Sequence, residues 1–445
     1  MNKSPEHIFP KVHIKTFGCQ MNEYDSLRMI QLLESHGFSQ TQSYDDAAAI
    51  ILNTCTVRKK AEDKVYSELG RINTIKKQKP HLIIGVGGCL AQQEGQNLIS
   101  KYPYIDFAFG TKALQHLPHL LDRALHGKKT VAVDMATSRT MYPEAPYASA
   151  DSQITAFVTI MQGCNNYCSY CIVPYVRGPE WSRSTLEIVQ EVRHLVDNGI
   201  KEVTLLGQNV NSYGTTLTPL SSFSQLLCEV NRIKGLERIR FTTSHPKDLS
   251  SNLIAAFTQV EKLCEHIHLP LQSGSDMILR KMNRSYTRDE YRKKIDSLKK
   301  NVPHISLTSD IIVGFPGETE KDFMETLLMI QEICFDDLFI FHYTDRPGTK
   351  ASLSIDNVPY EVKIERLRLL NDLQRKISLS INSRLIGETV SVLLEGSSKK
   401  GVGTIAGRTR TNKVVNCKGP LELKGSTVSV KIEKTNIHSL TGRIL

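Results

Sequence analysis

The sequence has little of what marks a membrane-bound or secreted protein. No apolar run approaches the roughly 20 residues that a membrane-spanning helix needs. The first seven residues contain no apolar segment of the kind found in signal peptides. Tryptophan occurs once, at Trp181, and its surroundings suggest no role for it. We therefore expect a cytoplasmic protein without membrane contact.

Acidic residues are also in deficit. The chain has 56 lysines and arginines against 46 aspartates and glutamates, which gives a formal net charge of +10. This balance favours a polyanionic partner, although charge alone does not identify one. With 40% hydrophobic and 23% charged residues, the composition is that of an ordinary globular protein. A length of 445 residues predicts roughly two to three domains.

Disulfides are not expected in a cytosolic chain, so the ten cysteines are candidates for metal ligands or buried thiols. Cys164, Cys168 and Cys171 lie in one short loop with the spacing C-x3-C-x2-C. Three thiolates can hold three corners of a cubane iron–sulfur cluster and leave one iron open for a ligand. Zinc is the alternative, but its sites usually repeat a C-x2-C pair, and no second pair occurs here. With Tyr170 before the third cysteine, the loop resembles the signature of the radical S-adenosylmethionine (SAM) superfamily.

Three further cysteines each end a short apolar segment in the first third of the chain. They are Cys19, Cys55 and Cys89, and a helical pattern follows each of them. Alternation of strands and helices predicts a parallel sheet with helices on its faces. Because the ends of parallel strands meet at one edge of a sheet, the three thiols should converge there. We expect a second three-cysteine iron–sulfur cluster at this edge, with ordinary packed thiols as the alternative.

Strands and amphipathic helices then alternate six times from about residue 154 onward. Strand-like runs occur at residues 156–160, 202–206, 238–242, 266–269, 305–313 and 338–343. This pattern predicts a (β/α)6 partial barrel with its active site at the C-terminal strand ends. Candidates there to bind a zwitterionic nucleoside cofactor, together with Tyr170, are Gln208, Asn209, Ser244, Gln272, Ser273, Ser275, Gly314 and Glu318. Turn and helix-capping chemistry is the alternative for each of them, and Ser275 could simply cap the next helix.

The last sixty residues change to short alternating strands, which predict a small antiparallel β-barrel. A basic turn between two of these strands carries Arg408, Arg410, Asn412 and Lys413. Small barrels with basic loops commonly bind nucleic acid, and a solvated hairpin is the alternative. The domain limits that follow are 10–126 for the cysteine domain, 127–149 for a linker, 150–380 for the partial barrel and 383–445 for the terminal barrel.

Nearly the whole chain resembles the methylthiotransferases of the radical SAM superfamily. The resemblance rests on long blocks, at residues 15–22, 53–55, 163–178, 205–214, 243–249, 268–275, 310–318 and 407–416. It implies an N-terminal α/β cysteine domain, a SAM barrel and a terminal TRAM domain that recruits the substrate. In the TRAM segment, Cys417 stands where an aromatic residue is expected, which weakens any prediction of base stacking there.

The resemblance also implies cofactors, substrate and partners. The loop cysteines would hold a SAM-cleaving [4Fe–4S] cluster, and the three sheet-edge cysteines an auxiliary [4Fe–4S] cluster that delivers sulfur. The implied product is a methylthio group at carbon 2 of N6-isopentenyladenosine, adjacent 3′ to the anticodon in tRNAs that read codons beginning with U. The implied partners are the tRNA anticodon stem-loop and a low-potential electron donor such as flavodoxin or ferredoxin, and the protein is expected to be a monomer.

Two other interpretations remain open. Sister enzymes share both clusters but modify a threonylcarbamoyl-adenosine of tRNA or an aspartate of a ribosomal protein. The basic turn favours a tRNA substrate, because a protein substrate would gain little from phosphate-binding side chains. The second interpretation is a non-catalytic iron–sulfur protein that binds RNA or senses redox state. Such a protein needs no SAM pocket, so the polar residues at the strand ends argue against it.

Overall fold

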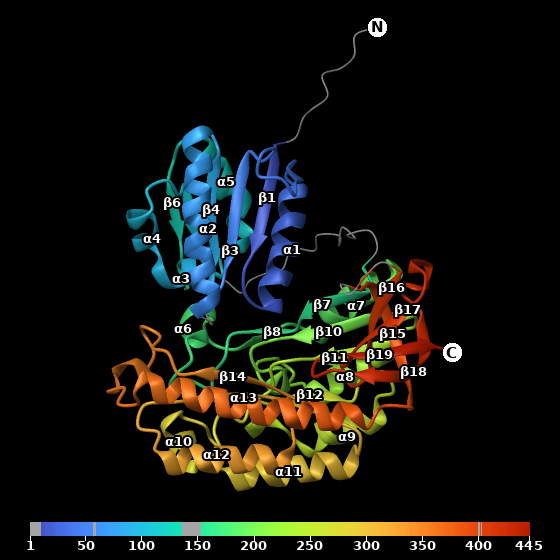
Figure 1. Ribbon diagram of the computed structural model, residues 1–445. Coiled ribbons are helices and arrows are strands. Elements are labelled where there is room, and N and C mark those ends of the chain that lie inside the picture. Colours follow the sequence, from blue (N-terminus) through green and yellow to red (C-terminus); the bar gives the residue numbers. More distant parts are fainter. Residues whose placement is uncertain (1–9, 57–58, 136–152, 399–400, 402) are drawn as a thin grey trace. The chain divides into compact units, whose positions relative to one another are not determined.

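The computed structural model describes residues 10–56, 59–135, 153–398, 401 and 403–445 (Figure 1). The chain divides into two compact units. Unit 1 combines the residues before 149 with 162–165 and 171–181, and unit 2 holds the rest. This division differs from the predicted domain limits, which stay a prediction.

Unit 1 contains a six-stranded sheet in the order β2-β1-β3-β4-β5-β6, and every neighbouring pair is parallel. Its strands are β1 Lys11–Thr16, β2 Ser39–Gln40, β3 Ala49–Thr54, β4 Ile83–Gly88, β5 Phe107–Phe109 and β6 Thr130–Ala132. Its helices are α1 Gln20–Glu34, α2 Lys59–Gln78, α3 Cys89–Glu94, α4 Gln96–Lys101, η1 Leu114–His116, α5 Leu117–Leu125 and α6 Val173–Arg177. The predicted parallel sheet is confirmed.

Helices cover both faces of this sheet because successive strand residues point to opposite sides. Ile51 packs on one face in a buried cluster with residues of α1 and α5. Its neighbours in sequence, Ile50 and Leu52, pack on the other face with residues of α2, α3 and α4. Figure 1 shows α2 lying along the sheet. The near-continuous apolar strands of the sequence are thus explained by burial on both sides.

The structure adds elements that the sequence pattern did not predict. The strands β5 and β6 extend the sheet, and β6 lies inside the stretch 127–149 assigned to a linker. Three-residue strands are too short to show a periodic pattern. Residues 136–149 of the same stretch lie outside the described residues. The single helix expected after Cys89 is divided at Gly95, whose φ of +52° interrupts the helical backbone between α3 and α4.

Unit 2 contains the six predicted barrel strands. They are β7 Thr155–Thr159, β10 Glu202–Leu206, β11 Arg238–Phe241, β12 His266–His268, β13 Ser306–Val313 and β14 Asp337–His342. They form two parallel sheets, β11-β10-β7 and β12-β13-β14, and a parallel bridge joins Ile239 of β11 to Leu263 just before β12. The α/β core predicted from the sequence is confirmed. The short strands β8 Met161–Gln162 and β9 Trp181–Ser182 flank the cysteine loop in sequence.

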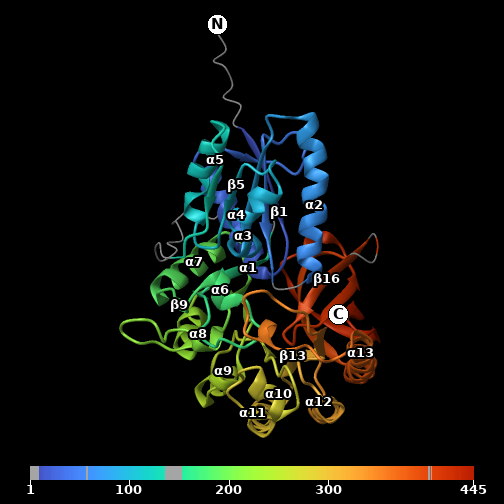
Figure 2. The same cartoon turned by 90° about the vertical axis from the view of Figure 1, so that its left-hand side faces the viewer.

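Helices follow the strands and form an outer layer in which chain neighbours pack together (Figure 2). They are α7 Thr185–Asp197, η2 Val210–Ser212, α8 Phe223–Asn231, η3 Pro246–Asp248, α9 Ser251–Gln259, α10 Asp276–Lys281, α11 Arg288–Asn301, α12 Glu320–Ile333, η4 Ala351–Leu353 and α13 Tyr360–Ser383. Capping boxes start several of them: Ser184 with Glu187 begins α7, and Thr287 with Glu290 begins α11. Such caps fix where each strand-to-helix loop ends.

The terminal barrel is closed, in the order β15-β16-β17-β19-β18. Its elements are β15 Thr389–Ser397, β16 Thr404–Thr409, β17 Val414–Lys418, η5 Leu421–Leu423, β18 Thr427–Thr435 and β19 Leu440–Ile444. All pairs are antiparallel except β17 with β19. Cys417 is 1% exposed and packs in the barrel core, so this position has no contact with solvent. Burial raises the pKa of its thiol to about 11.

Candidate iron–sulfur and cofactor sites

The cysteines of unit 1 lie at one edge of its sheet. The strands β1, β3 and β4 are neighbours, and Cys19, Cys55 and Cys89 follow their C-terminal ends. The register places Thr54 opposite Gly88, so Cys55 and Cys89 are the next residues on adjacent strands. The thiols of Cys19 and Cys55 share a hydrogen bond. The tertiary structure therefore brings together three cysteines that are more than thirty residues apart.

Two glycines allow the cysteine loops to approach one another. A Cβ added to Gly18 would lie 2.3 Å from Cys55 Cβ and 2.9 Å from Cys55 Sγ. A Cβ added to Gly88 would lie 2.4 Å from the Thr54 carbonyl oxygen. Both glycines have positive φ, +115° and +92°, in the region that other residues rarely adopt. Only glycine can occupy these two positions without displacing the loops that carry the thiols.

The surroundings favour the thiolate form at Cys19 and disfavour it at Cys89. The hydrogen bond with Cys55 lowers the pKa of Cys19 to about 6, although desolvation by the surrounding protein acts in the opposite direction. Burial raises the pKa of Cys89, and the nearby Arg177 guanidinium opposes this. Among the described residues, no three His, Cys, Asp or Glu side chains are arranged to hold a single metal ion. A cubane cluster has no such requirement, because each thiolate binds a different iron.

The loop with the C-x3-C-x2-C spacing contributes residues to both units. In unit 1, the backbone N–H of Cys164 donates to the Gly178 carbonyl oxygen at 3.2 Å. In unit 2, Cys168 Sγ accepts a hydrogen bond from Arg284 Nη1 at 3.4 Å. Cys164 and Cys168 are each 8% exposed, and Cys171 is half-buried. A hydrogen bond to a ligand sulfur is one of the factors that tune an iron–sulfur cluster.

Three of the predicted cofactor residues carry buried oxygens that no described group satisfies. These atoms are Asn209 Oδ1, Ser244 Oγ and Gln272 Oε1, and all three residues follow barrel strands. Buried polar atoms nearly always have a hydrogen-bond partner, so such atoms at strand ends point to a ligand. Gln272 and Thr243, the residue before Ser244, both have φ of +70°, a strained conformation that clusters at ligand sites.

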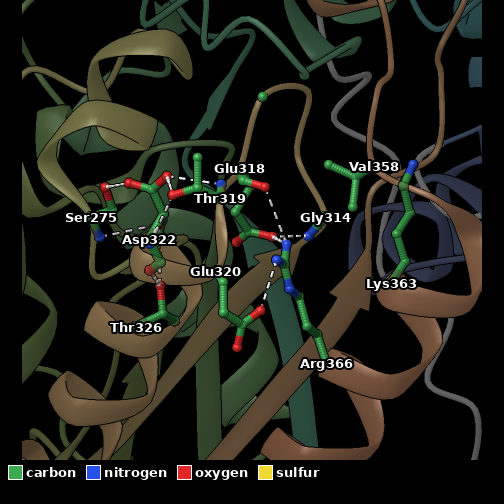
Figure 3. A network of polar contacts seen from close by, with 12 residues as sticks. Ser275, Gly314, Glu318, Thr319, Glu320, Asp322, Thr326, Val358, Lys363 and Arg366 are labelled. Carbon is green, nitrogen blue, oxygen red and sulfur yellow. Dashed lines mark hydrogen bonds and ion pairs between the residues drawn. The ribbon is translucent and has the colours of Figure 1, made fainter.

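Other predicted cofactor residues are engaged within the chain (Figure 3). Ser275 begins α10 by accepting a hydrogen bond from the Ile278 N–H, and it donates to Asp322 Oδ1 at 2.5 Å. The capping alternative for Ser275 is therefore what the structure shows. The neighbouring Ser273 Oγ lies 3.3 Å from Thr326 Oγ1.

Glu318 belongs to a separate buried pair. Its carboxylate accepts from the Gly314 N–H and lies 2.8 Å from Arg366 Nη1 (Figure 3). Burial raises the pKa of Glu318 to about 7, although Gly314 and Arg366 both lower it. Tyr170 packs in a buried apolar cluster and Gln208 is half-buried after β10. Contact of any of these residues with SAM stays a prediction.

The basic turn of the terminal barrel already has partners within unit 2. Arg410 donates to the Glu265 carboxylate at 2.7 and 2.9 Å, and Lys413 Nζ lies 2.6 Å from Asp336 Oδ1. Arg408 Nη1 lies 3.3 Å from Asn412 Oδ1. All four residues predicted to bind nucleic acid thus make contacts inside the chain. Their contact with nucleic acid stays a prediction.

Similarity to known proteins decides the family. Residues 11–110 match the uncharacterized protein family UPF0004, residues 158–330 the radical SAM superfamily and residues 383–445 the TRAM domain. The chain is 49% identical over 439 residues to the tRNA-2-methylthio-N(6)-dimethylallyladenosine synthase of Syntrophus aciditrophicus, covering 98% of this chain and 94% of that protein. The synthase of the same name from Geotalea uraniireducens is also 49% identical, over 97% of this chain and 98% of its own length. The chain belongs to this synthase family.

Solved structures agree with the fold. The radical SAM methyltransferase TsrM from Kitasatospora setae, solved with cobalamin and a [4Fe–4S] cluster, matches with a TM-score of 0.58 at 12% identity. The match covers 88% of this chain and 82% of that chain. No helix within the described ranges is long and apolar enough to cross a membrane.

A synthase of this family is a radical SAM enzyme that uses SAM and [4Fe–4S] clusters, and the residues present fit both groups. The glycine-flanked thiols at the sheet edge fit a cluster, and the unsatisfied oxygens at the barrel strand ends fit the polar groups of SAM. Two buried arginines near the cysteines were not predicted. Arg284 donates to Cys168 Sγ, and Arg177 bonds Asn22 beside Cys19. No sequence pattern singles them out, because their partners are distant in the chain.

Proposed function

We propose that this synthase adds a methylthio group to carbon 2 of N6-isopentenyladenosine, adjacent 3′ to the anticodon in tRNAs that read codons beginning with U. The observation that carries the proposal is the 49% identity to tRNA-2-methylthio-N(6)-dimethylallyladenosine synthases over 98% of the chain. This similarity spans the cysteine domain, the radical SAM barrel and the TRAM domain together.

The proposal divides the six cysteines between two clusters. Cys164, Cys168 and Cys171 hold the cluster that binds SAM, and the three sheet-edge cysteines hold the auxiliary cluster. The bound clusters and SAM supply the electron, the radical and the sulfur, because acid–base side chains cannot activate a purine C–H bond at this position. The chain's own part is to hold the thiolates, to orient SAM and to admit the base. The spacing of the loop and the convergence at the sheet edge support this division.

The SAM site in this proposal centres on Asn209, Ser244 and Gln272. Their unsatisfied amide and hydroxyl oxygens can accept hydrogen bonds from the ammonium and ribose hydroxyl groups of SAM. Tyr170, Gln208 and the backbone at Gly314 complete the candidate set. Ser273, Ser275 and Glu318 belong to the same candidate set, and their side chains are also held by residues of α12 and α13.

The proposed partners follow from the same chemistry. The substrate is the anticodon stem-loop of a tRNA, and its target base must leave the stack to reach a buried cluster. A low-potential donor such as flavodoxin or ferredoxin would supply the electron to the cluster that Cys164, Cys168 and Cys171 would hold. We place the protein in the cytoplasm, where tRNAs and such donors are found, and expect it to be a monomer.

Nucleoside mass spectrometry on tRNA tests the reaction. The reconstituted protein is incubated anaerobically with SAM and a reductant, and isopentenylated and threonylcarbamoylated tRNAs are supplied in parallel. We expect the methylthio product only on the isopentenyl nucleoside. Product only on the threonylcarbamoyl nucleoside would keep the chemistry and refute the substrate. Deoxyadenosine without product on either tRNA would refute a tRNA substrate.

Three cysteine variants test the cluster assignments. Cys168→Ala should abolish SAM cleavage, because one corner of the SAM-binding cluster is lost. Cys55→Ala should keep some SAM cleavage and stop methylthio formation. Cys228→Ala is the matched control, since Cys228 is an exposed thiol on α8 and should leave both readouts unchanged. Full methylthio formation by Cys55→Ala would refute the auxiliary assignment.

A further inference from the structure

A buried arginine lies beside the cysteines of unit 1. Arg177 ends α6, and its side chain is 4% exposed. Its Nη2 donates to Asp25 Oδ2 at 2.9 Å and lies 3.2 Å from Asn22 Oδ1. Asp25 is itself 8% exposed at its side chain. A buried guanidinium needs negatively charged groups close by. Asp25 is only one of the negatively charged groups near Arg177.

The second terminal nitrogen of this guanidinium makes no hydrogen bond of normal geometry with a described residue, and Arg177 Nη1 is buried. The guanidinium nevertheless lies close enough to the Cys89 thiol to interact with it and oppose the rise of its pKa. Burial alone would lower the pKa of Arg177, but Cys89, Asp25 and Cys19 together raise it, so the group stays charged. The charges that surround it therefore include two of the three sheet-edge thiols. A buried donor without a hydrogen bond of normal geometry is rare in native proteins, and here it lies in the field of the cysteines.

Asn22 connects Arg177 to the loops that carry the cysteines. The amide nitrogen of Asn22 donates to the Phe17 carbonyl and to the Thr54 carbonyl, both at 2.9 Å. These carbonyls directly precede the Gly18–Cys19 turn and Cys55. The oxygen of the same amide accepts from Arg177 and from the Cys19 thiol, the latter at 3.7 Å. Arg177 thus helps to orient a side chain that joins two of the cysteine loops.

The position of α6 along the chain gives this contact a second consequence. Arg177 is six residues after Cys171, the last cysteine of the SAM loop. The Thr111 hydroxyl donates to the Val176 carbonyl at 2.6 Å, and Val176 packs with Ile172 and Cys89. The segment that starts at Cys171 is therefore anchored within unit 1 at the auxiliary cysteines. Six extended residues span at most about 20 Å, so this segment limits how far Cys171 can lie from Arg177.

We propose that Arg177 is the positioning residue and counter-charge of the auxiliary cluster. Its Nη1 donates to a sulfur of the cluster or of a cysteine ligand, and its charge offsets the negative charge of the thiolate-bound cluster. Asp25 fixes the position of the guanidinium and partly neutralises its positive charge. Net charge and hydrogen bonds to sulfur set the reduction potential of such clusters, so Arg177 raises that potential and Asp25 lowers it. This inference rests on the proposed auxiliary cluster.

The test isolates the auxiliary cluster in the full-length chain. Cys164, Cys168 and Cys171 are replaced together by alanine, and the chain is reconstituted anaerobically with iron and sulfide. Iron and sulfide per chain are measured first, and the reduction potential is then followed by absorbance and electron paramagnetic resonance. The variants are Arg177→Gln, Arg177→Lys and Asp25→Asn in this background.

We expect opposite shifts from the two halves of the pair. Arg177→Gln should make the cluster about tenfold harder to reduce, a shift of about 59 mV for one electron. Asp25→Asn should shift the potential in the other direction. Arg177→Lys should keep the potential near that of the parent chain but speed the loss of iron to a chelator, because lysine cannot bond Asn22 and Asp25 together. Arg183→Gln is the matched control, since it breaks a buried pair with Glu191 in unit 2 and should leave the potential unchanged.

The possible failures are distinguishable. No iron in the triple-alanine chain would refute the auxiliary cluster and the function that depends on it. A loaded cluster whose potential moves in the same direction, or not at all, in Arg177→Gln and Asp25→Asn would refute the role of Arg177 alone. Should Arg177→Gln fail to fold, Asp25→Asn decides by itself, and an unchanged potential there would overturn the proposal.

Discussion

Some charged side chains inside this protein lie beside a group of opposite charge, and His245 shows the opposite case. Arg240 lies 2.8 Å from Glu202 and both are almost fully buried. His245 is 5% exposed, and no acidic group among the described residues acts on its ring. Its Nδ1 accepts from the Lys247 N–H at 3.2 Å, so this nitrogen carries no proton. Burial, reinforced by Arg284 and nearby lysines, lowers the pKa of His245 to about 2.

His245 should therefore make the fold sensitive to acid. The unfolded chain binds a proton at this histidine below about pH 6.5, while the folded chain stays neutral until about pH 2. Stability is complete above pH 6.5 and falls with decreasing pH, by about 1.4 kcal/mol per unit from this group. Urea unfolding at pH 7.5 and 5.5 measures the difference, and His245→Asn should reduce it. His119→Asn, on the outside of α5, is the control; an unchanged pH dependence in His245→Asn would contradict the assignment.

At the scale of single elements, the candidate site residues lie at strand ends and in the turns after them. In unit 1, three parallel strands end in loops that carry one cysteine each, and glycines with positive φ shape two of those turns. In unit 2, the residues after β10, β11 and β12 leave oxygens unsatisfied, while capping boxes hold the helices that follow. The same arrangement, a rigid strand followed by a short turn, thus serves both sites.

Gly18→Ala should damage the auxiliary site more than the fold. A left-handed backbone costs alanine about 1 to 2 kcal/mol, and the new methyl group would also displace Cys55. Iron content after reconstitution should fall, and the melting temperature should fall modestly. Gly127→Ala is the matched control, because Gly127 also has positive φ, +74°, but has nothing within 4 Å of the added Cβ. Equal iron content in the two variants would show that Gly18 is not part of the site.

At the scale of the whole molecule, polar contacts attach the TRAM barrel to the radical SAM core within unit 2. Arg238 donates to the Arg408 carbonyl at 2.6 Å, and Arg240 donates to the Thr409 carbonyl at 2.7 Å. Arg410 adds the Glu265 pair and a hydrogen bond to the Leu263 carbonyl at 2.6 Å. The basic turn that resembles a nucleic-acid loop is thus also part of a domain contact.

Arg410→Ala should loosen this contact. The side chain is 31% exposed, so the ion pair is partly screened, but two charge-assisted hydrogen bonds to backbone oxygens are lost as well. We expect a decrease of about 1 to 2 kcal/mol in the free energy of unfolding, measured by urea denaturation. Arg443→Ala is the control, because its pair with Glu433 is exposed and contributes little. Equal effects would show that Arg410 has no role in attaching the barrel.

Features that depend on local order could be predicted from the sequence alone. The loop spacing of Cys164, Cys168 and Cys171 is a property of consecutive residues, and the barrel strands follow from apolar runs between turn residues. Position at the end of a strand also identified candidate cofactor-binding residues. Three of these residues carry the unsatisfied oxygens found at the site. The inward position of Cys417 was not predicted, because a short strand in a small barrel does not show which of its faces is buried.

Contacts between segments that are distant in sequence could be seen only in the folded chain. The register of β3 against β4 puts Cys55 beside Cys89, and the fold brings Arg177 to Asn22 and Asp25 across more than 150 residues. The partners of Arg410 could not be predicted either, because Glu265 is distant in sequence from the basic turn. A sequence pattern reports the preferences of neighbouring residues. Contacts between buried charges form only in the folded chain, where water can no longer solvate these groups.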